Sequence, residues 1–375
     1  MSAHIPGLVR WGKSVVATAM HGIAAWPTSA AESIVRGALR LVPESEANSF
    51  DAKNREPYLD SRPTTKQALA APQSRFVDAE EISWLESNRH ELPYRRDKLW
   101  AVPQMWWEMT FGEVGSGTYL AGAAVGNTAS MATGWAVSTI CKGILLWADL
   151  GRPDRVFRVF AKPNSSWISR GALAYVGFTV AGGLSLLPVA KPVRTSAKVI
   201  ASVCATVLGT YDGLFLQRAK GVASWTDSSI PALFAVNGMA AGVHVANALV
   251  TDKRVNVASS IATVAGTGLG VLYARRLTEG STAQRLSARD LLEGIQQDRF
   301  VGLGLGLGGV GAAAMALIPS RWSRSVASGF AVLGVAGIRR AILEAGIHAP
   351  VIDPPRGNIN PIDHVEVSKG VSSNE

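Results

Sequence analysis

Three ionisable side chains, Glu113, Lys142 and Asp212, stand inside otherwise apolar stretches of this 375-residue chain. Charged groups at membrane depth are unfavourable, and they usually pair with one another, line a cavity or carry a function. At about 1.5 Å per helical residue, Glu113 lies roughly 13 Å and Lys142 roughly 10 Å from the same edge of the predicted bundle. Asp212 and its neighbour Tyr211 lie at a similar or shallower level. One half of a bilayer therefore gathers these groups, and Lys142 is the predicted partner of Glu113.

A polar segment, ADLGRPDRVFRVFAKPNSSWISRG, joins two long apolar stretches and is rich in basic residues. It contains Asp149 and Arg152, which are three apart at a helix end and could form an ordinary structural pair. It also contains Arg170, which begins the next apolar stretch. The segment is predicted to be a loop that forms the floor of a pocket. The candidate site comprises Tyr211, Glu113, Asp149, Arg152, Arg170, Lys142 and Asp212.

Eight stretches are long and apolar enough to be membrane-spanning helices, which need about 20 residues each. They are 104–126, 129–148, 171–190, 199–217, 228–251, 255–274, 300–320 and 321–340. Glu108 and Glu113 interrupt the first stretch. Arg324 and Arg339 lie near the ends of the last, where long side chains can reach the headgroups. The sequence predicts an all-α, polytopic membrane protein with about eight transmembrane helices in a bundle.

A glycine-rich run, GLGLGLGGVG, lies in the seventh stretch. It is a poor match to a dinucleotide-binding loop, because no predicted strand precedes it. Gly302 and Gly306, like Gly304 and Gly308, are four apart, as expected for close helix–helix packing in lipid.

The chain divides into three regions by composition. Residues 1–103 form a polar N-terminal extension, with amphipathic helices, an extended linker and a short helix near 78–89, and could serve as a docking arm. Residues 104–346 form the transmembrane domain, and residues 347–375 form a C-terminal tail. Eight spans would place both termini on one side, which also carries most of the Lys and Arg residues. The positive-inside rule then predicts cytoplasmic termini in the cell (inner) membrane.

The net charge of +9 does not indicate nucleic-acid binding, because the basic residues lie between apolar stretches rather than in one patch. Cys141 and Cys204 are too few and too far apart for a metal cluster. His244 is the one histidine inside a predicted span, whereas a membrane cytochrome needs facing histidines. We therefore expect no haem and no metal in this chain, and a helix-packing role for His244.

Several spaced motifs resemble the NrfD/PsrC family, the membrane subunits of polysulfide-reductase-like oxidoreductases. LLWADLGRPDRVFRVF followed by KPNSSWISRGAL resembles its DLGRP…P-x-S-x-W-S-R-G segment. GTYDGLFLQRAKGVASWTDSSIPALFAVNGMAAG resembles its fourth and fifth spans, FGEVGSGTYLAG its first and GIRRAILEAG its last. The likeness covers about 104–346.

This resemblance implies a membrane anchor subunit that binds a quinone, menaquinone or ubiquinone. It also implies an iron–sulfur subunit docked nearby and a molybdopterin-type or related catalytic subunit as partners. Tyr211 matches the family's quinone-contacting tyrosine, whereas Glu113 stands where the family often has another polar or small residue. The extension at 1–103 and the predicted cytoplasmic docking face depart from the family pattern.

Two other functions remain open from the sequence. The buried Glu, Lys and Asp residues could form the relay of a proton or solute transporter, although no internal repeat of the kind common in transporters is evident. A purely structural anchor would use the same groups as ion pairs between helices. In that case Glu113, Tyr211 and Asp212 would tolerate replacement.

Overall fold

The computed structural model describes residues 103–149, 157, 159–160, 166–219 and 222–348. All regular structure in these residues is helical, which confirms the predicted all-α class. The elements are α6 (Pro103–Val125), α7 (Thr128–Ala136), η3 (Val137–Cys141), α8 (Lys142–Asp149), α9 (Trp167–Leu186), α10 (Lys191–Gln217), η5 (Ala223–Thr226), α11 (Ile230–Leu249), α12 (Lys253–Thr278), α13 (Thr282–Leu292), η6 (Asp298–Gly311), α14 (Ala312–Leu317) and α15 (Arg321–His348). Apart from Pro103 and the last two residues of α15, the predicted N-terminal extension and C-terminal tail lie outside the described residues.

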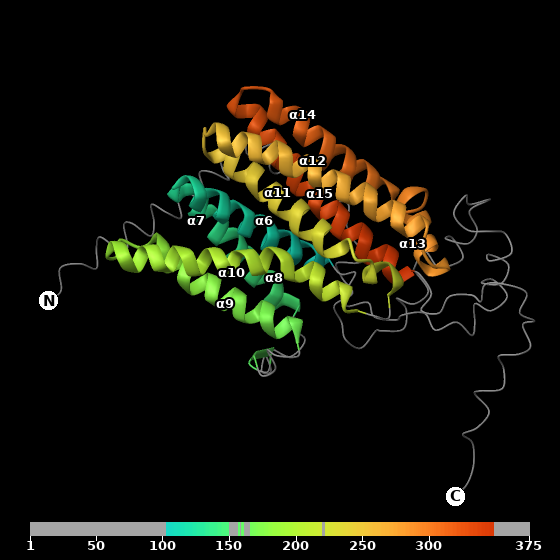
Figure 1. The fold of residues 1–375 in the computed structure, drawn as a ribbon, viewed down its shortest axis with the longest axis horizontal. Coiled ribbons are helices and arrows are strands. Elements are labelled where there is room, and N and C mark those ends of the chain that lie inside the picture. Colours follow the sequence, from blue (N-terminus) through green and yellow to red (C-terminus); the bar gives the residue numbers. More distant parts are fainter. Residues whose placement is uncertain (1–102, 150–156, 158, 161–165, 220–221, 349–375) are drawn as a thin grey trace, which may run out of the picture.

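Eight long helical rods make up the described chain, because α7, η3 and α8 run into one another, as do η6 and α14 (Figure 1). Six of the rods are long and apolar enough to cross a membrane. They are Thr128–Ala148, Lys191–Gln217, Ile230–Leu249, Lys253–Thr278, Asp298–Leu317 and Arg321–Gly346. By length and composition, these six helices mark the chain as a multi-pass membrane protein.

The other two rods, α6 and α9, are long but are not among these six candidate spans. The first carries Glu108 and Glu113, as the sequence indicated. The second begins at Trp167, four residues before the predicted start, and therefore includes Arg170. It ends at Leu186 because Leu187, with φ −79° and ψ 154°, is extended ahead of a proline.

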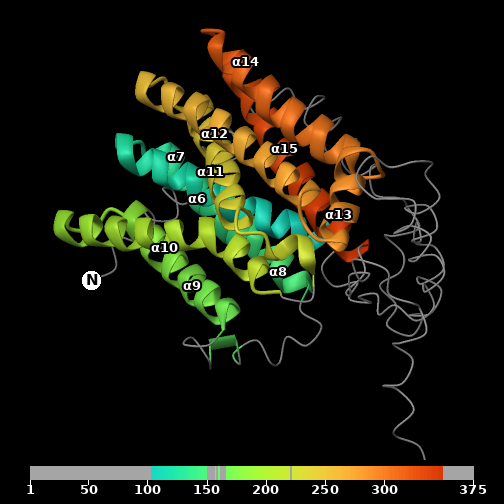
Figure 2. The same cartoon turned by 45° about the vertical axis from the view of Figure 1, so that its right-hand side comes forward.

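The rods pack as two groups of four (Figures 1 and 2). The first bundle contains α6, the α7–α8 rod, α9 and α10. The second bundle contains α11, α12, the η6–α14 rod and α15. The two bundles meet where α6 and α10 pack against α11 and where α6 packs against α15.

Small residues bring the two bundles into close contact. A β-carbon on Gly117 of α6 would lie 2.6 Å from the carbonyl oxygen of Met239 on α11. A β-carbon on Gly213 of α10 would lie 2.7 Å from Cα of Pro231. Such backbone-to-backbone packing is typical of helices in lipid, where small residues let helices approach.

The glycine run of η6 meets α15 through one of its two predicted glycine pairs. A β-carbon on Gly308 would lie 2.5 Å from Cα of Gly334 on α15, and Gly304 faces Ile338 of the same helix. Gly302 has no neighbour within 4 Å, and Gly306 meets only an oxygen of its own helix. The packing prediction is therefore confirmed for Gly304 and Gly308 but wrong for the other pair. Residues two apart point to opposite sides of a helix, so both pairs cannot face α15.

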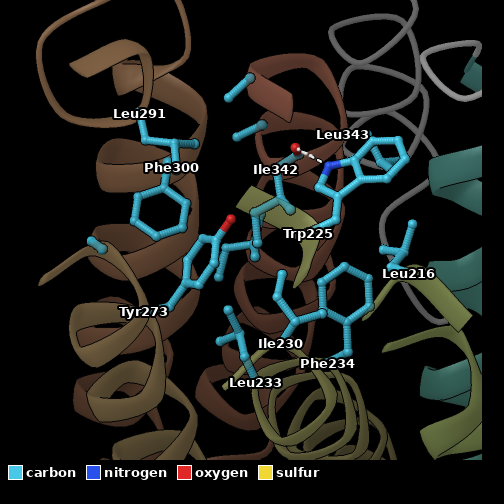
Figure 3. Packing of buried hydrophobic residues seen from close by; sticks show 14 of the residues in the cluster. Leu216, Trp225, Ile230, Leu233, Phe234, Tyr273, Leu291, Phe300, Ile342 and Leu343 are labelled. Atoms are coloured by element: carbon cyan, nitrogen blue, oxygen red, sulfur yellow. Dashed lines mark hydrogen bonds between the residues drawn. The ribbon is translucent and has the colours of Figure 1, made fainter. Parts of the chain in front are cut away.

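A large aromatic and aliphatic cluster closes one end of the molecule (Figure 3). It includes Trp225 of η5, whose indole N–H donates to the carbonyl of Ile342 on α15 at 3.0 Å. The short helix α13 packs nearby and is held at its start by a capping box of Ser281 and Gln284. We call this end the loop face. The other end, at the turns around Gly126, Pro188, Thr251 and Ser320, is the opposite face.

Candidate functional site

Two acidic side chains of α6 lie inside the protein and have different partners. Glu108 forms an ion pair with Lys142 of α8, and both side chains are almost completely buried. Lys142 had been predicted to pair with Glu113, which lies five residues further along α6. The prediction used only the depth of each residue along its helix. Which of the two acids faces α8 depends on how α6 is rotated about its own axis.

Glu113 pairs instead with Arg339 of α15, across the junction of the two bundles. Its Oε2 accepts from Nη2 of Arg339 at 2.5 Å and from Nε at 3.1 Å, and both side chains are fully buried. The same Nη2 also donates to the carbonyl of Phe234 at 2.8 Å, and the guanidinium carbon lies 3.6 Å from the centre of that residue's ring. The prediction that Arg339 lies at a membrane edge is wrong, because α15 continues to His348.

Tyr211 and Asp212 of α10 complete the cluster. Asp212 is 1% exposed, and neither of its carboxylate oxygens has a hydrogen-bond partner in good geometry among the described residues. It interacts electrostatically with Lys142, whose Nζ lies 5.3 Å from the centre of the Tyr211 ring. The ring packs flat on Gly171 of α9, where a β-carbon would lie 2.5 Å from Cε2. We call Glu108, Glu113, Lys142, Tyr211, Asp212 and Arg339 the buried polar cluster.

The charges of the buried polar cluster do not balance. It contains three carboxyl groups but two basic groups, and each basic group is paired with one of the glutamates. Asp212 is left without a salt bridge of its own. An unpaired ionised carboxylate is strongly unfavourable in a dry interior. The cluster is therefore built to hold one additional proton or a hydrogen-bond donor beside Asp212.

Glycines make room for the charged groups. A β-carbon on Gly112 would lie 2.9 Å from Nζ of Lys142, and Gly238 of α11 lies against the carboxylate of Glu113. Side chains at these two positions would displace the ion pairs, so the small residues are part of the site.

Of the remaining predicted site residues, Arg170 is the one whose side chain the structure describes. Arg170 is half-buried at the start of α9, and its guanidinium carbon lies 4.7 Å from the centre of the Trp167 ring. Arg218 lies 5.8 Å from the same ring. The side chain of Asp149 and the whole of Arg152 lie outside the described residues. Glu113, Lys142, Tyr211 and Asp212 are thus brought together, while Arg170 stands nearer the loop face.

Glu108 and Arg339 are the functional candidates that the sequence analysis missed. Glu108 was treated as an interruption of a span, although its position five residues before Glu113 places a second acid in the same apolar helix. The signal for Arg339 was the apolar sequence on both of its sides: a basic residue well inside a long helix needs a buried partner.

His244 is hydrogen-bonded between two helices, as predicted. It is fully buried, and its Nε2 lies 2.6 Å from the hydroxyl of Thr263 on α12. Within the described ranges, no group of three His, Cys, Asp or Glu residues is arranged to hold a metal ion. Cys141 and Cys204 are both free thiols and half-buried.

Comparisons of the chain with protein-family models and with curated proteins give no match. The resemblance to the NrfD/PsrC family therefore rests on the spaced motifs alone.

Proposed function

We propose that this chain is the quinone-interacting membrane subunit of a multi-subunit oxidoreductase of the molybdopterin and iron–sulfur type. In this role it passes electrons between an iron–sulfur partner and the quinone pool, with proton transfer. The observation that carries the proposal is the carboxyl group of Asp212, which has no salt bridge and lies beside Tyr211 in a buried cluster that is short of one positive charge.

The residues around Tyr211 suit a quinone head group. A bound quinone would supply two-electron, two-proton redox chemistry. The tyrosine hydroxyl can donate a hydrogen bond to a carbonyl oxygen without placing a charge in the membrane. Asp212 can hold or release a proton next to it, and Lys142 offsets the negative charge that remains when the proton leaves. Glu113 and Arg339 extend the same network toward the second bundle.

The outer surfaces of α8 and α9 are suited to a lipid-soluble ligand. Ile144 and Trp147 of α8 are 64% and 62% exposed, and Ile168 of α9 is 48% exposed. These apolar side chains face outward near the same end of the bundle as Tyr211. In our proposal, the isoprenoid tail stays in the lipid beside these helices while the head group reaches Tyr211.

The partner subunits would dock on the loop face. Arg275 and Arg276 at the end of α12 are 75% and 46% exposed and have acidic neighbours in Glu279 and Asp227. Exposed arginines that already hold carboxylates can exchange them for the carboxylates of a partner surface. The N-terminal extension would add a docking arm on the same side.

Replacing Tyr211 with Phe is expected to slow electron transfer to or from a quinone about 10²-fold, since general acid–base groups contribute at least this much. Assembly of the complex and its dye-linked catalytic activity should be retained, because the ring and its packing on Gly171 remain. Tyr119→Phe is the matched control. Its hydroxyl is also buried in the first bundle but bonds Ser185 near the opposite face, at 2.8 Å. Unchanged quinone turnover in both Tyr211→Phe and Glu113→Gln would rule out this site.

We further propose that the loop face is cytoplasmic and that the chain lies in the inner membrane, since the loop-face connections carry most of the basic residues. Reporter domains inserted after Gly151 and after Gly280 are expected to report the cytoplasm. Insertions after Pro188 and Thr251, in turns of the opposite face, should report the other compartment. A reversed pattern would overturn the orientation and leave the helical fold unaffected.

A proton transporter is the second candidate, and the same surplus carboxyl group favours it. The two functions differ in what they need. A transporter would move protons across vesicles without any quinone, whereas the proposed subunit would need a quinone and an electron donor. Proton uptake by vesicles that contain the purified chain alone distinguishes them.

A further inference from the structure

Polar residues continue from the Glu113–Arg339 pair through the second bundle. On α11, Phe234 accepts the hydrogen bond of Arg339 and is followed by Asn237, His244 and Asn247. These positions are three or seven apart and fall on one side of the helix. At a rise of about 1.5 Å per residue, they cover about 20 Å between the ion pair and the opposite face.

Buried polar atoms without partners mark this route. The atoms are Oε1 of Glu113, Nη1 of Arg339, Oδ1 of Asn237, Nδ1 of His244 and Oδ1 of Asn247, and none has a hydrogen-bond partner among the described residues. Buried polar groups in proteins almost always bond to the protein or to ordered water. A series of such atoms along one helix side indicates a hydrated route rather than a dry contact between helices.

A cavity lies on this route between α11, α12, η6 and α15. The centre of a water molecule could occupy about 10 Å³ of this cavity. This volume is close to what one water needs. Its walls include Asn237, Ala241, Thr263, Gly304, Ala331 and Val335. Small side chains keep it open, and Asn237 and Thr263 provide polar groups on two of its sides.

The route continues from the cavity to the opposite face by side-chain contacts. Thr263 lines the cavity and also contacts Nε2 of His244 at 2.6 Å. One helical turn further along α11, the amide of Asn247 donates to Oδ1 of Asn256 on α12 at 2.9 Å. Asn256 is half-buried and follows Asp252, the residue that caps the start of α12.

We propose that Asn237, His244 and Asn247 of α11, with Thr263 and Asn256 of α12, bind a file of water molecules that connects Glu113 with the opposite face. Each water can accept a proton on one side and release one on the other, so that a proton moves along the file without net chemistry. Glu113 then has access to protons from the side of the membrane opposite the loop face. The proposal concerns water and this chain alone, and it stands whether or not a quinone binds near Tyr211.

Radiolytic labelling of the full-length protein in nanodiscs, in ¹⁸O-enriched water, tests the file. Hydroxyl radicals formed from bound water oxidise the side chains next to it. His244 is fully buried but lies on the file, so it is expected to gain ¹⁸O. Phe178 is equally buried, in the apolar cluster of the first bundle, and should remain unlabelled. Labelling of His244 no greater than that of Phe178 would overturn the proposal without any variant.

A cavity-filling variant makes the test specific. Ala241→Leu places a larger apolar side chain in the cavity wall and should abolish the labelling of His244. Ala232→Leu makes the same change on the exposed side of α11 and should leave that labelling intact. Labelling of His244 that is the same in folded Ala241→Leu and in the wild type would contradict the proposal. No quinone is added, so either result leaves the quinone site to be tested separately.

Discussion

Replacing Arg339 with Gln is expected to destabilise the protein by about 3–5 kcal/mol, as is usual when one partner of a buried ion pair is removed. The reason is that Glu113 would lose the cation that compensates its carboxylate, in an interior where both side chains are fully buried, and would have to stay unpaired or take up a proton. Arg339 also holds the carbonyl of Phe234, so the variant would loosen the contact between α11 and α15 as well. Unfolding of the purified protein in detergent, followed by circular dichroism, measures the loss.

Two further variants separate the effect of the unpaired charge on stability from the effect of the lost contact between helices. Glu113→Gln/Arg339→Gln removes both charges and is expected to regain much of the lost stability, because no ion is left uncompensated. Arg254→Gln breaks an exposed pair with Asp252, in which the arginine side chain is 78% exposed, and should change stability by less than about 1 kcal/mol. If the double variant were as unstable as Arg339→Gln, the charge argument would be wrong and packing alone would explain the loss.

Replacing Lys142 with Met is expected to have the second large effect, a loss of about 3–5 kcal/mol, again as for a broken buried pair. Methionine fits the volume of the lysine stem but leaves Glu108 without its partner and Asp212 without the cation that interacts with it most strongly. If the proposed function holds, quinone turnover should also fall. Thermal unfolding and quinone turnover are the two measurements.

The matched variants again distinguish the effect of the lost charge from the effect of the changed side-chain shape. Lys142→Met/Glu108→Gln removes the pair together and is expected to restore stability in large part. Lys253→Met changes an exposed lysine at the start of α12 and should have little effect. Wild-type stability in Lys142→Met would show that the buried carboxyl groups of Glu108 and Asp212 are not stabilised by this cation. The argument that the cluster is short of one positive charge would then be wrong.

The sequence by itself determined the long helical elements and the level of the buried groups. Apolar stretches of the right length specify helices wherever backbone groups must bond internally in lipid. Local signals then specify the turns. Gly126 has a φ of 71°, and Asn127 caps α7 by accepting from the backbone of Ser130. Counting residues from the helix ends placed Glu113, Lys142, Tyr211 and Asp212 in one half of the bundle, where the structure also has them.

The tertiary structure alone decided which groups meet. Glu113 and Arg339 are 226 residues apart, and their contact depends on how the second bundle packs against the first. Sequence periodicity gives the level of a residue along its own helix, but the rotation of that helix toward each neighbour is set by packing. Lys142 therefore faces Glu108 rather than Glu113, and Gly308 faces α15 while Gly302 does not. The energy of a buried charge depends on the neighbour within a few ångströms, so its partner is decided by the packed helices rather than by composition.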